Sequence, residues 1–591
     1  MNPLFHLRAS WMTARRAGLR RVGHRIQRRV RLRFFDPYWA HRLYPPPTLN
    51  GASPAPLRQS ISDLIRYFIR QRSQSHFNHQ WDQSRNQLTL LNQKPFALGD
   101  SLDWQSHPSP DPLWAFQLHG WEWLWGALMD EDAYEEILLL TYDWIRSHPI
   151  GRGIAWEPYP TSRRLIVWSA AWVVLGSPPE LTAALAQQTA FLADHLERDL
   201  ENNHLIANAK ALAWVGILLA ELPQAESWRT LGLDCLWTQL KAQVNPDGGH
   251  EENSSGYHLA VWLDGMETAL LSQAAGQPVP SEIWTILEKM GEFAFALRRP
   301  DGRLPLLNDS IQDEPLPLQT IFSLAADLFD RDDFGWAAGR EEYAPPALIA
   351  KGFDDTGYAI LRMGTDPETE TYLLFDAGNL GPDHCPGHGH ADALSIELWS
   401  QGQPILIDPG TYQYPAGEWR DYFRGTAAHS TATIDDENQS IFAGPFRIAD
   451  MAHARLDSVT IEPSYLEARG EHDGYLRLKS PVLHKRRVRL HGADLVTVED
   501  TFEGEFEHTV ALHFHLTPCH VDTQGMSSAV ASLSRGLRVE FTVSSAAKGQ
   551  FKVEPGWISR GWYEKEESPV LVYRATVELP VTMTTHISIK G

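Results

Sequence analysis

The spacing of apolar residues changes from a helical to an alternating pattern near residue 350. In the first half, leucines recur at four- and seven-residue intervals, as at Leu181, Leu185 and Leu192, which places them on one helix face. In the second half, apolar and polar residues alternate over 537–541, which is typical of a strand with one buried face. A chain of 591 residues is also too long for one simple core. The sequence therefore predicts a helical domain followed by an antiparallel β-sandwich.

Short breaks containing Gly or Pro separate the predicted elements on both sides of this change. Many helices joined by short turns indicate stacked antiparallel pairs. Of the 22 tryptophans, 18 precede residue 350, which supports the same division. Helices are predicted over 205–222, 226–243, 256–275, 281–298 and 317–329, and strands over 358–363, 372–377, 394–399, 405–408, 482–490, 510–516, 537–543 and 570–579.

The N-terminal segment differs from the rest of the chain in charge. Residues 1–35 hold ten arginines and no Asp or Glu, whereas the remainder carries 42 Lys and Arg against 74 Asp and Glu. The acidic body disfavours nucleic acid as a partner. The basic segment predicts a helix that packs against or trails from that body, and a contact with a membrane surface or a polyanion is the alternative. The Pro-rich stretch 43–58 is interpreted as a linker.

The sequence shows neither the apolar core of a typical signal peptide nor an apolar run long enough to span a membrane. No stretch approaches about 18 uninterrupted apolar residues, so no transmembrane segment is predicted. No apolar signal core precedes Phe34 and Phe35. Three cysteines exclude a disulfide scaffold and a cysteine zinc cluster. No pattern specifies an oligomeric state.

Histidines and an aspartate in the second half form the densest candidate site. His388 and His390 lie two residues apart, so on an extended segment they point to opposite faces and serve different purposes. Asp408 ends the next predicted strand, and His429 follows it. Imidazole nitrogens and a carboxylate suit Zn²⁺ or a similar divalent ion. The alternative is a group of surface histidines near a hairpin.

Two polar runs in the helical half are the other candidates. Asn203 and His204 open a predicted helix, where capping alone accounts for an asparagine. Tyr257 and His258 begin another helix after a Gly-Gly turn. A tyrosine there can simply pack with its hydroxyl bonded, whereas a functional role needs a reaction that uses a tyrosine and a nearby histidine.

Five motifs in order resemble the heparinase II/III-like polysaccharide lyases. The resemblance extends from about residue 110 to the C-terminus and implies an N-terminal (α/α) toroid followed by an antiparallel β-sandwich. We accordingly expect a basic segment and linker over 1–58, the toroid over 59–345 and the sandwich over 346–591. The motifs are Asn-Asn-His at 202–204, Gly-Gly…Tyr-His ending at 258, His-Gly-His-Ala-Asp-Ala-Leu-Ser at 388–395, Leu-Ile-Asp-Pro-Gly-Thr-Tyr at 406–412 and Arg-Gly-Thr-Ala-Ala-His-Ser-Thr at 424–431.

The resemblance implies cleavage of a uronic-acid-containing polysaccharide by β-elimination. By position, Asn203 and His388 would neutralise the substrate carboxylate, and Tyr257 would act as acid and also as base, with His204 as the alternative base. A tyrosine base needs a pKa below about 10, for which nearby Arg424 is a candidate. The metal ligands implied are His390, Asp408 and His429, with zinc as a structural ion near the active site. Further candidates for substrate contact are Arg424, His258, Arg163 and Trp156.

Two other functions are compatible with these residues. One is a non-catalytic uronate-binding protein of exopolysaccharide synthesis or export, and the other is a glycoside hydrolase that uses acids among Glu251, Glu252 and Asp309. The expected partner is in each case a polysaccharide, and an acidic one for the lyase. The resemblance implies a periplasmic or envelope-associated protein, whereas the lack of a clear signal peptide favours a cytoplasmic one.

Overall fold

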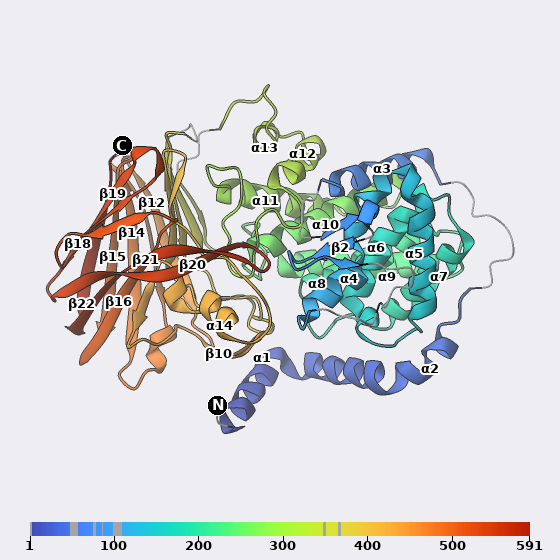
Figure 1. The fold of residues 1–591 in the computed structure, drawn as a ribbon, viewed down its shortest axis with the longest axis horizontal. Helices are drawn as coiled ribbons and strands as arrows, with labels where there is room; N and C mark the ends of the chain where they lie inside the picture. Colours follow the sequence, from blue (N-terminus) through green and yellow to red (C-terminus); the bar gives the residue numbers. More distant parts are fainter. Residues whose placement is uncertain are drawn as a thin grey trace.

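The chain folds into a helical half and a β-rich half, with one further helical segment along both. The computed structural model describes residues 3–47, 57–74, 79–85, 87–97, 104, 109–346, 350–364 and 368–590. Figure 1 shows the helices of the first half on one side, the large sheets on the other and α1 along the lower edge. The predicted order, helices followed by an antiparallel β-rich region, is confirmed. The closed toroid remains a prediction.

The helical half begins after the Pro-rich stretch and ends before residue 338. Several helices start with proline in their first turn, where its missing N–H group has no helical partner to lose. The helices are α3 (Gln59–Arg72), α4 (Pro112–Gly120), α5 (Tyr134–Ser147), α6 (Pro158–Val174), α7 (Pro179–Ala193), α8 (Asn203–Leu218), α9 (Ala225–Gln243), α10 (Ser255–Ala274), α11 (Ser281–Leu297), α12 (Leu318–Phe329) and α13 (Asp332–Ala337).

Side-chain caps fix the starts of the two helices that carry candidate residues. The side chain of Asn202 accepts a hydrogen bond from the backbone N–H of His204 and starts α8. Ser254 caps α10 in the same way through the N–H of Tyr257. Capping residues satisfy donors that a helix leaves unpaired at its N-terminus. Consequently Asn203, His204 and Tyr257 lie in first turns.

The β-rich half contains sheets of five, eight and four strands and one two-stranded ribbon. Every pair of neighbouring strands is antiparallel. The orders are β4-β5-β6-β7-β8, β12-β13-β14-β15-β22-β19-β18-β17, β20-β21-β16-β9 and β10-β11. The strands are β4 (Ala350–Phe353), β5 (Tyr358–Met363), β6 (Thr371–Asp376), β7 (Ser395–Ser400), β8 (Gln403–Leu406), β9 (Ala432–Ile434), β10 (Ile441–Gly444), β11 (Arg447–Asp450), β12 (Ala454–Glu462), β13 (Tyr465–His472), β14 (Val482–His491), β15 (Leu495–Gly504), β16 (Glu507–His515), β17 (His520–Thr523), β18 (Ser528–Ser532), β19 (Arg538–Ser545), β20 (Gly549–Gly561), β21 (Glu564–Glu578) and β22 (Val581–Lys590).

The sandwich core follows from strict alternation. In β14 every second residue is buried, and its apolar side chains join a core cluster with those of β15, β16 and β19. A short helix, α14 (Glu418–Arg424), interrupts the strands beside the candidate site. The helical half also holds a small three-stranded sheet that the sequence analysis did not predict, formed by β1 (His79–Asp82), β2 (Gln87–Leu90) and β3 (Phe96–Ala97).

The basic N-terminal segment is helical and packs against both halves. It comprises α1 (Pro3–Val30), a π-helical turn (Arg31–Phe35) and α2 (Asp36–Leu43), with a break at Gly18. Arg28 forms two hydrogen bonds of 2.9 Å with Asp199 in the helical half. Arg16 donates to the carbonyl oxygens of Ile448 and Ala449 at β11. Within the described ranges, no helix is both long and apolar enough to cross a bilayer.

Candidate active site

A cavity of about 1170 Å³ lies between the two halves and is bordered by α1. The helical half supplies His204 and Tyr257 to its wall, and the β-rich half supplies His388 and Tyr414. Residues from all three parts of the chain therefore face one space of the size expected for a ligand site.

Tyr257 and His388 are in direct contact across the boundary between the halves. Their ring centroids are 4.3 Å apart. The Tyr257 hydroxyl is 2.8 Å from the hydroxyl of Tyr414, which follows the Ile-Asp-Pro-Gly turn. Burial and the nearby Tyr414 and Asp309 raise the pKa of Tyr257 well above its ordinary value. This is opposite to the lowered pKa that a tyrosine base requires, and it keeps the phenol a proton donor.

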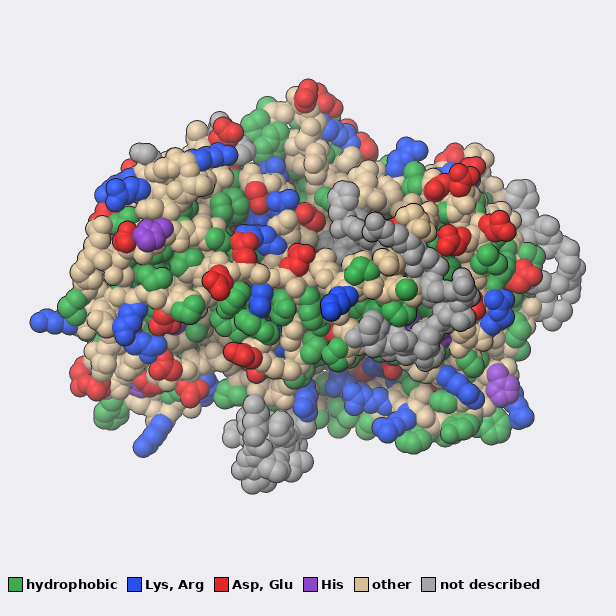
Figure 2. All heavy atoms as spheres, in the orientation of Figure 1, with side chains coloured by type: hydrophobic (Ala, Val, Ile, Leu, Met, Phe, Trp, Pro, Cys, Tyr) green, Lys and Arg blue, Asp and Glu red, His purple; other side chains and the backbone are tan. Residues whose placement is uncertain are grey.

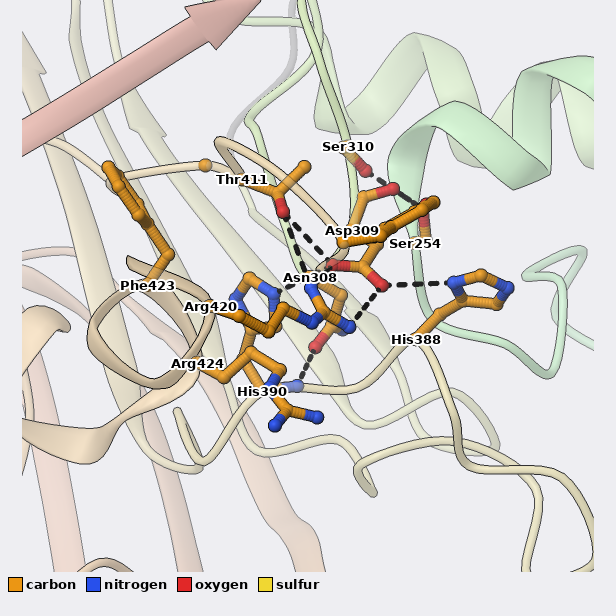
Figure 3. A network of polar contacts seen from close by, with 12 residues as sticks. Ser254, Asn308, Asp309, Ser310, His388, His390, Thr411, Arg420, Phe423 and Arg424 are labelled. Carbon is orange, nitrogen blue, oxygen red and sulfur yellow. Dashed lines mark hydrogen bonds and ion pairs between the residues drawn. The ribbon is translucent and has the colours of Figure 1, made fainter. Parts of the chain in front are cut away.

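Asp309 organises the histidines behind this contact (Figure 3). One of its oxygens lies 2.9 Å from Nδ1 of His388, and the other lies 3.2 Å from Nε2 of His390. Arg420 donates to both oxygens, and Thr411 donates to one of them. Burial opposes ionisation of Asp309, but Arg420 and the two histidines hold its pKa well below the ordinary value.

The two histidines diverge as expected, although the segment that carries them is a turn and not a strand. His388 lies on the cavity wall with 12 % of its side chain exposed, whereas the His390 side chain is fully buried. The two rings lie on different sides of Asp309, because each ring contacts a different oxygen of its carboxylate.

Asn203 is buried and faces a carboxylate, not the cavity. Its side-chain amide donates to Oε1 of Glu252 at 2.8 Å, and its backbone N–H donates to the same oxygen at 3.0 Å. The other oxygen of Glu252 lies 3.9 Å from Nε2 of His388. Burial raises the pKa of Glu252, but His388, His250 and Asn203 together lower it below the ordinary value. Asn203 is therefore connected to the cavity only indirectly, through its hydrogen bond to Glu252 and the contact of Glu252 with His388.

His204 lies on the cavity wall beside a buried carboxylate. Its Nδ1 is 3.2 Å from Oε1 of Glu197, and its ring stacks on Tyr159 with centroids 4.1 Å apart. Burial opposes ionisation of Glu197, whereas His204, Arg28 and Asn208 lower its pKa below the ordinary value. An ionised partner on Nδ1 fixes the ring so that Nε2 is the available nitrogen.

His390, Asp408 and His429 form a possible metal-binding triad. Their ligand atoms all lie within 4.8 Å of one another, and all three residues are buried. The buried Nδ1 of His390 has no hydrogen-bond partner among the described residues, while its Nε2 faces Asp309. The Nε2 of His429 faces the carbonyl oxygen of Phe423. Metal-bound histidines usually direct their second nitrogen at a carboxylate or carbonyl in this way, so the donor set fits a divalent ion.

Comparison with known proteins identifies the family to which the chain belongs. The N-terminal heparinase II/III family matches residues 59–336, and the heparinase II/III-like C-terminal family matches residues 345–589. The chain belongs to the heparinase II/III-like family.

Relatives of this family member include curated enzymes and solved structures. A heparin-sulfate lyase of Bacteroides stercoris is 23% identical over 522 residues, 80% of this chain and 74% of that protein. A heparin-sulfate lyase of Bacteroides thetaiotaomicron is 28% identical over 356 residues, 56% of this chain and 48% of that protein. A crystal structure titled heparinase III superposes with a TM-score of 0.75 at 20% identity, over 93% of this chain and 87% of that one, which supports the fold. Together, the family and the curated relatives support a polysaccharide lyase.

Three of the four expected substrate contacts of this heparinase II/III-like chain lie away from the cavity. Arg424 is buried, donates to the carbonyl oxygens of Gly444 and Pro445, and does not line the cavity wall. Trp156 and His258 are also buried; the first packs on Phe191, and the second faces the carbonyl oxygen of Met290. These expectations are corrected, because burial and internal contacts occupy the side chains.

Arg163 does line the cavity, but carboxylates already bind it. It contacts Glu122 through Nη2 and Asp264 through Nη1, the latter at 3.2 Å. Burial disfavours the Arg163 charge, but Glu122 and Asp264 raise the pKa well above its ordinary value. Arg163 therefore shapes the wall as part of an ion-pair network.

The sequence analysis did not assign roles in this site to Tyr414 or to Glu197. It considered Asp309 and Glu252 only as glycosidase acids. The one local signal for Tyr414 is its place two residues after the Asp-Pro-Gly-Thr-Tyr motif. No spacing links Asp309 to His388, because 79 residues separate them.

Proposed function

We propose that this protein cleaves a uronic-acid-containing polysaccharide by β-elimination. The observation that carries the proposal is the contact of Tyr257 with His388 on one cavity wall, with the Tyr257 phenol held protonated. A binding site has no need of a phenol and an imidazole from two domains in this relationship, whereas an elimination needs an acid, a base and a group that neutralises charge.

The chemistry sets the demands on the site. The proton to be removed is on C5 of the uronate, next to a carboxylate whose negative charge opposes carbanion formation. A base takes this proton, the electron pair forms the C4–C5 double bond, the bond from C4 to O4 breaks, and an acid protonates O4. A cationic or hydrogen-bonding group must stabilise the carboxylate as charge develops on it.

Tyr257 is the proposed acid, and His204 is the proposed base. The raised pKa of Tyr257 suits donation to O4. Glu197 holds Nδ1 of His204, so Nε2 is available to take the C5 proton. Two separate residues also explain why both His204 and Tyr257 lie on the wall of one cavity.

His388 is the proposed partner of the substrate carboxylate. Asp309 holds its Nδ1, and Figure 3 shows the rest of the ring directed away from Asp309. Asn203 acts on His388 indirectly, because its amide binds Glu252, and Glu252 lies beside His388. We therefore assign Asn203 a positioning role in this chain.

The proposed metal is zinc, held by His390, Asp408 and His429. When bound, it would supply a fixed positive charge that orders the turn carrying His388. Asp309 connects the two histidines, so order at His390 is transmitted to His388.

The charges of the cavity wall favour a substrate of modest charge density. Arg25 and Arg28 line the cavity but already bind Asp199, and Arg72 binds Glu267. Carboxylates also line it, among them Asp130, Glu314 and Asp383. A densely sulfated chain would meet this mixed wall unfavourably, so we favour a uronide polymer with few sulfates or none.

The hydrolase alternative is less well supported by the carboxylates considered for it. Asp309 and Glu252 are buried and bound to Arg420 and Asn203, and Glu251 does not line the cavity. An inverting or retaining glycosidase needs two accessible carboxyl groups about 5–10 Å apart.

A substrate screen tests the proposal. The purified protein is incubated with alginate, hyaluronan, heparan sulfate and bacterial uronide polymers. Elimination creates an unsaturated uronide with a new ultraviolet absorbance and no added water in the product mass. New reducing ends without that absorbance would favour the hydrolase, and binding by calorimetry without cleavage would favour the non-catalytic alternative.

A further inference from the structure

The outer face of the N-terminal helical segment carries an unusual row of exposed apolar side chains. We define the apolar stripe as Leu19, Ile26, Val30, Phe34, Phe35, Tyr38, Trp39 and Leu43. It contains eight of the sixteen large hydrophobic residues that are exposed in the described chain, within 25 consecutive positions. Leu19 is 92%, Phe34 61% and Tyr38 67% exposed. So dense a group of apolar residues marks an interaction surface.

The stripe is not needed to attach α1 to the rest of the protein. Arg21, Arg25 and Arg28 bind Asp199 and Glu201, and they recur at spacings of four and three residues on one helix face. At 100° per residue, this face lies roughly opposite the one carrying Leu19, Ile26 and Val30. The inner face therefore attaches the helix through ion pairs, and the outer face is left to solvent.

Position and charge indicate what the stripe contacts. Figure 1 places α1 and α2 along one edge of the molecule, and Figure 2 shows hydrophobic side chains along that lower edge with Lys and Arg side chains beside them. Exposed arginines accompany the stripe at Arg20, Arg33 and Arg42, and residues 1–35 contain no acidic residue.

We propose that this segment docks the protein on an anionic lipid bilayer, with the apolar stripe at the boundary between headgroups and acyl chains. Trp, Tyr and Phe side chains favour that boundary, and arginines beside them reach the lipid phosphates. A helical segment of about 25 residues extends roughly 37 Å, which suits a flat surface better than a pocket. Since no described helix can cross a bilayer, the segment lies on the membrane. Arg25 and Arg28 of the inner face line the cavity, so docking would bring the cavity entrance close to the membrane. This inference does not depend on the proposed lyase activity.

Vesicle flotation with the full chain tests the proposal. We expect strong binding to vesicles of phosphatidylcholine mixed with phosphatidylglycerol, weak binding to phosphatidylcholine alone, and loss of binding at high salt. Joint replacement Phe34→Ser and Trp39→Ser should lower the partition coefficient roughly tenfold or more, because each loses an apolar side chain that would enter the lipid. Joint replacement Arg20→Gln and Arg33→Gln should reduce the preference for anionic vesicles.

The matched control replaces two exposed apolar residues of the sandwich, Ile461→Ser and Phe506→Ser, and should bind vesicles like the unaltered chain. Equal loss in both apolar pairs would overturn the proposal, as would equal binding to neutral and anionic vesicles. Sedimentation without lipid gives the mass of each variant. A dimer of the unaltered chain that dissociates when Phe34 and Trp39 are replaced would assign the stripe to a second copy and also overturn it. Circular dichroism checks that each variant is folded.

Discussion

The phenol ring of Tyr257 and the imidazole ring of His388 lie with their centroids 4.3 Å apart, although they belong to different halves of the chain. Tyr257 is held by the first turn of α10, and His388 is held by a turn that Asp309 fixes. The reacting groups proposed for the elimination are thus assembled by the contact of two domains, and each can be tested separately.

Replacing Tyr257 by Phe should abolish formation of the unsaturated product. Loss of a general acid costs roughly 10²- to 10⁴-fold in rate, and the phenylalanine keeps the ring contact with His388. The rate is followed by ultraviolet absorbance, and folding by thermal melting. Tyr142→Phe removes a hydroxyl outside the cavity and should leave the rate unchanged. Full activity of the Tyr257 variant would refute the assignment.

His204→Gln should lower kcat by about 10²-fold or more if His204 removes the C5 proton. Glu197→Gln should lower kcat less, by roughly tenfold, because the base remains but loses the carboxylate on Nδ1. The pH profile separates the two roles, since only a base variant loses the acidic limb of the profile. An unaltered limb in His204→Gln would assign the base to another residue.

Asp309→Asn should impair both activity and folding stability. It removes the charge that pairs with buried Arg420, and breaking a buried ion pair costs about 3–5 kcal/mol of unfolding free energy. It also weakens the orientation of His388 and His390. Asp436→Asn, at an exposed ion pair with Arg574, should change stability by less than about 1 kcal/mol. Chemical denaturation measures the difference, and equal effects would contradict the central role of Asp309.

Elemental analysis of the purified protein should find one divalent ion per chain, which we expect to be zinc. His429→Ala should lose it, because two of three protein ligands do not hold the ion firmly. His520→Ala, an exposed histidine of the sandwich, should retain it. A chelator should lower the melting temperature of the unaltered protein and of His520→Ala, but not that of His429→Ala. Unchanged metal content in His429→Ala would refute the triad.

The pH dependence of stability should include a contribution from Glu251. Burial and the neighbouring Glu252 raise the pKa of Glu251 to about 8. An acid whose pKa is higher in the folded than in the unfolded state destabilises the fold as pH rises from the unfolded value of about 4.5 to about 8. Glu251→Gln should therefore raise stability at pH 8 relative to pH 5, by roughly 1–3 kcal/mol.

The control for this titration is Glu226→Gln, which alters an exposed carboxyl of α9 and should change stability equally at both pH values. Chemical denaturation at pH 5 and pH 8 provides the comparison. A Glu251→Gln variant with the pH dependence of the unaltered chain would show that this carboxyl is charged in the folded protein at neutral pH.

The sequence by itself determined the elements and their order. Apolar residues at helical spacing predict helices such as α9 and α12, and alternation predicts strands such as β14 and β19, because each pattern places apolar side chains on one face. The motifs that contain Tyr257 and His388 likewise pointed to two residues that meet on the wall of one cavity. Local chemistry was enough for these inferences, since caps, turns and burial patterns depend on neighbouring residues.

Only the tertiary structure decided which side chains meet and which are accessible. Asp309 contacts both His388 and His390, and Arg424 donates to backbone carbonyl oxygens. Burial raises the pKa of Tyr257, whereas a role as base would require a lowered one. Such contacts join positions far apart in the chain, and desolvation depends on the packing of both halves. No local pattern records either quantity, because both arise only when the domains close around a shared cavity.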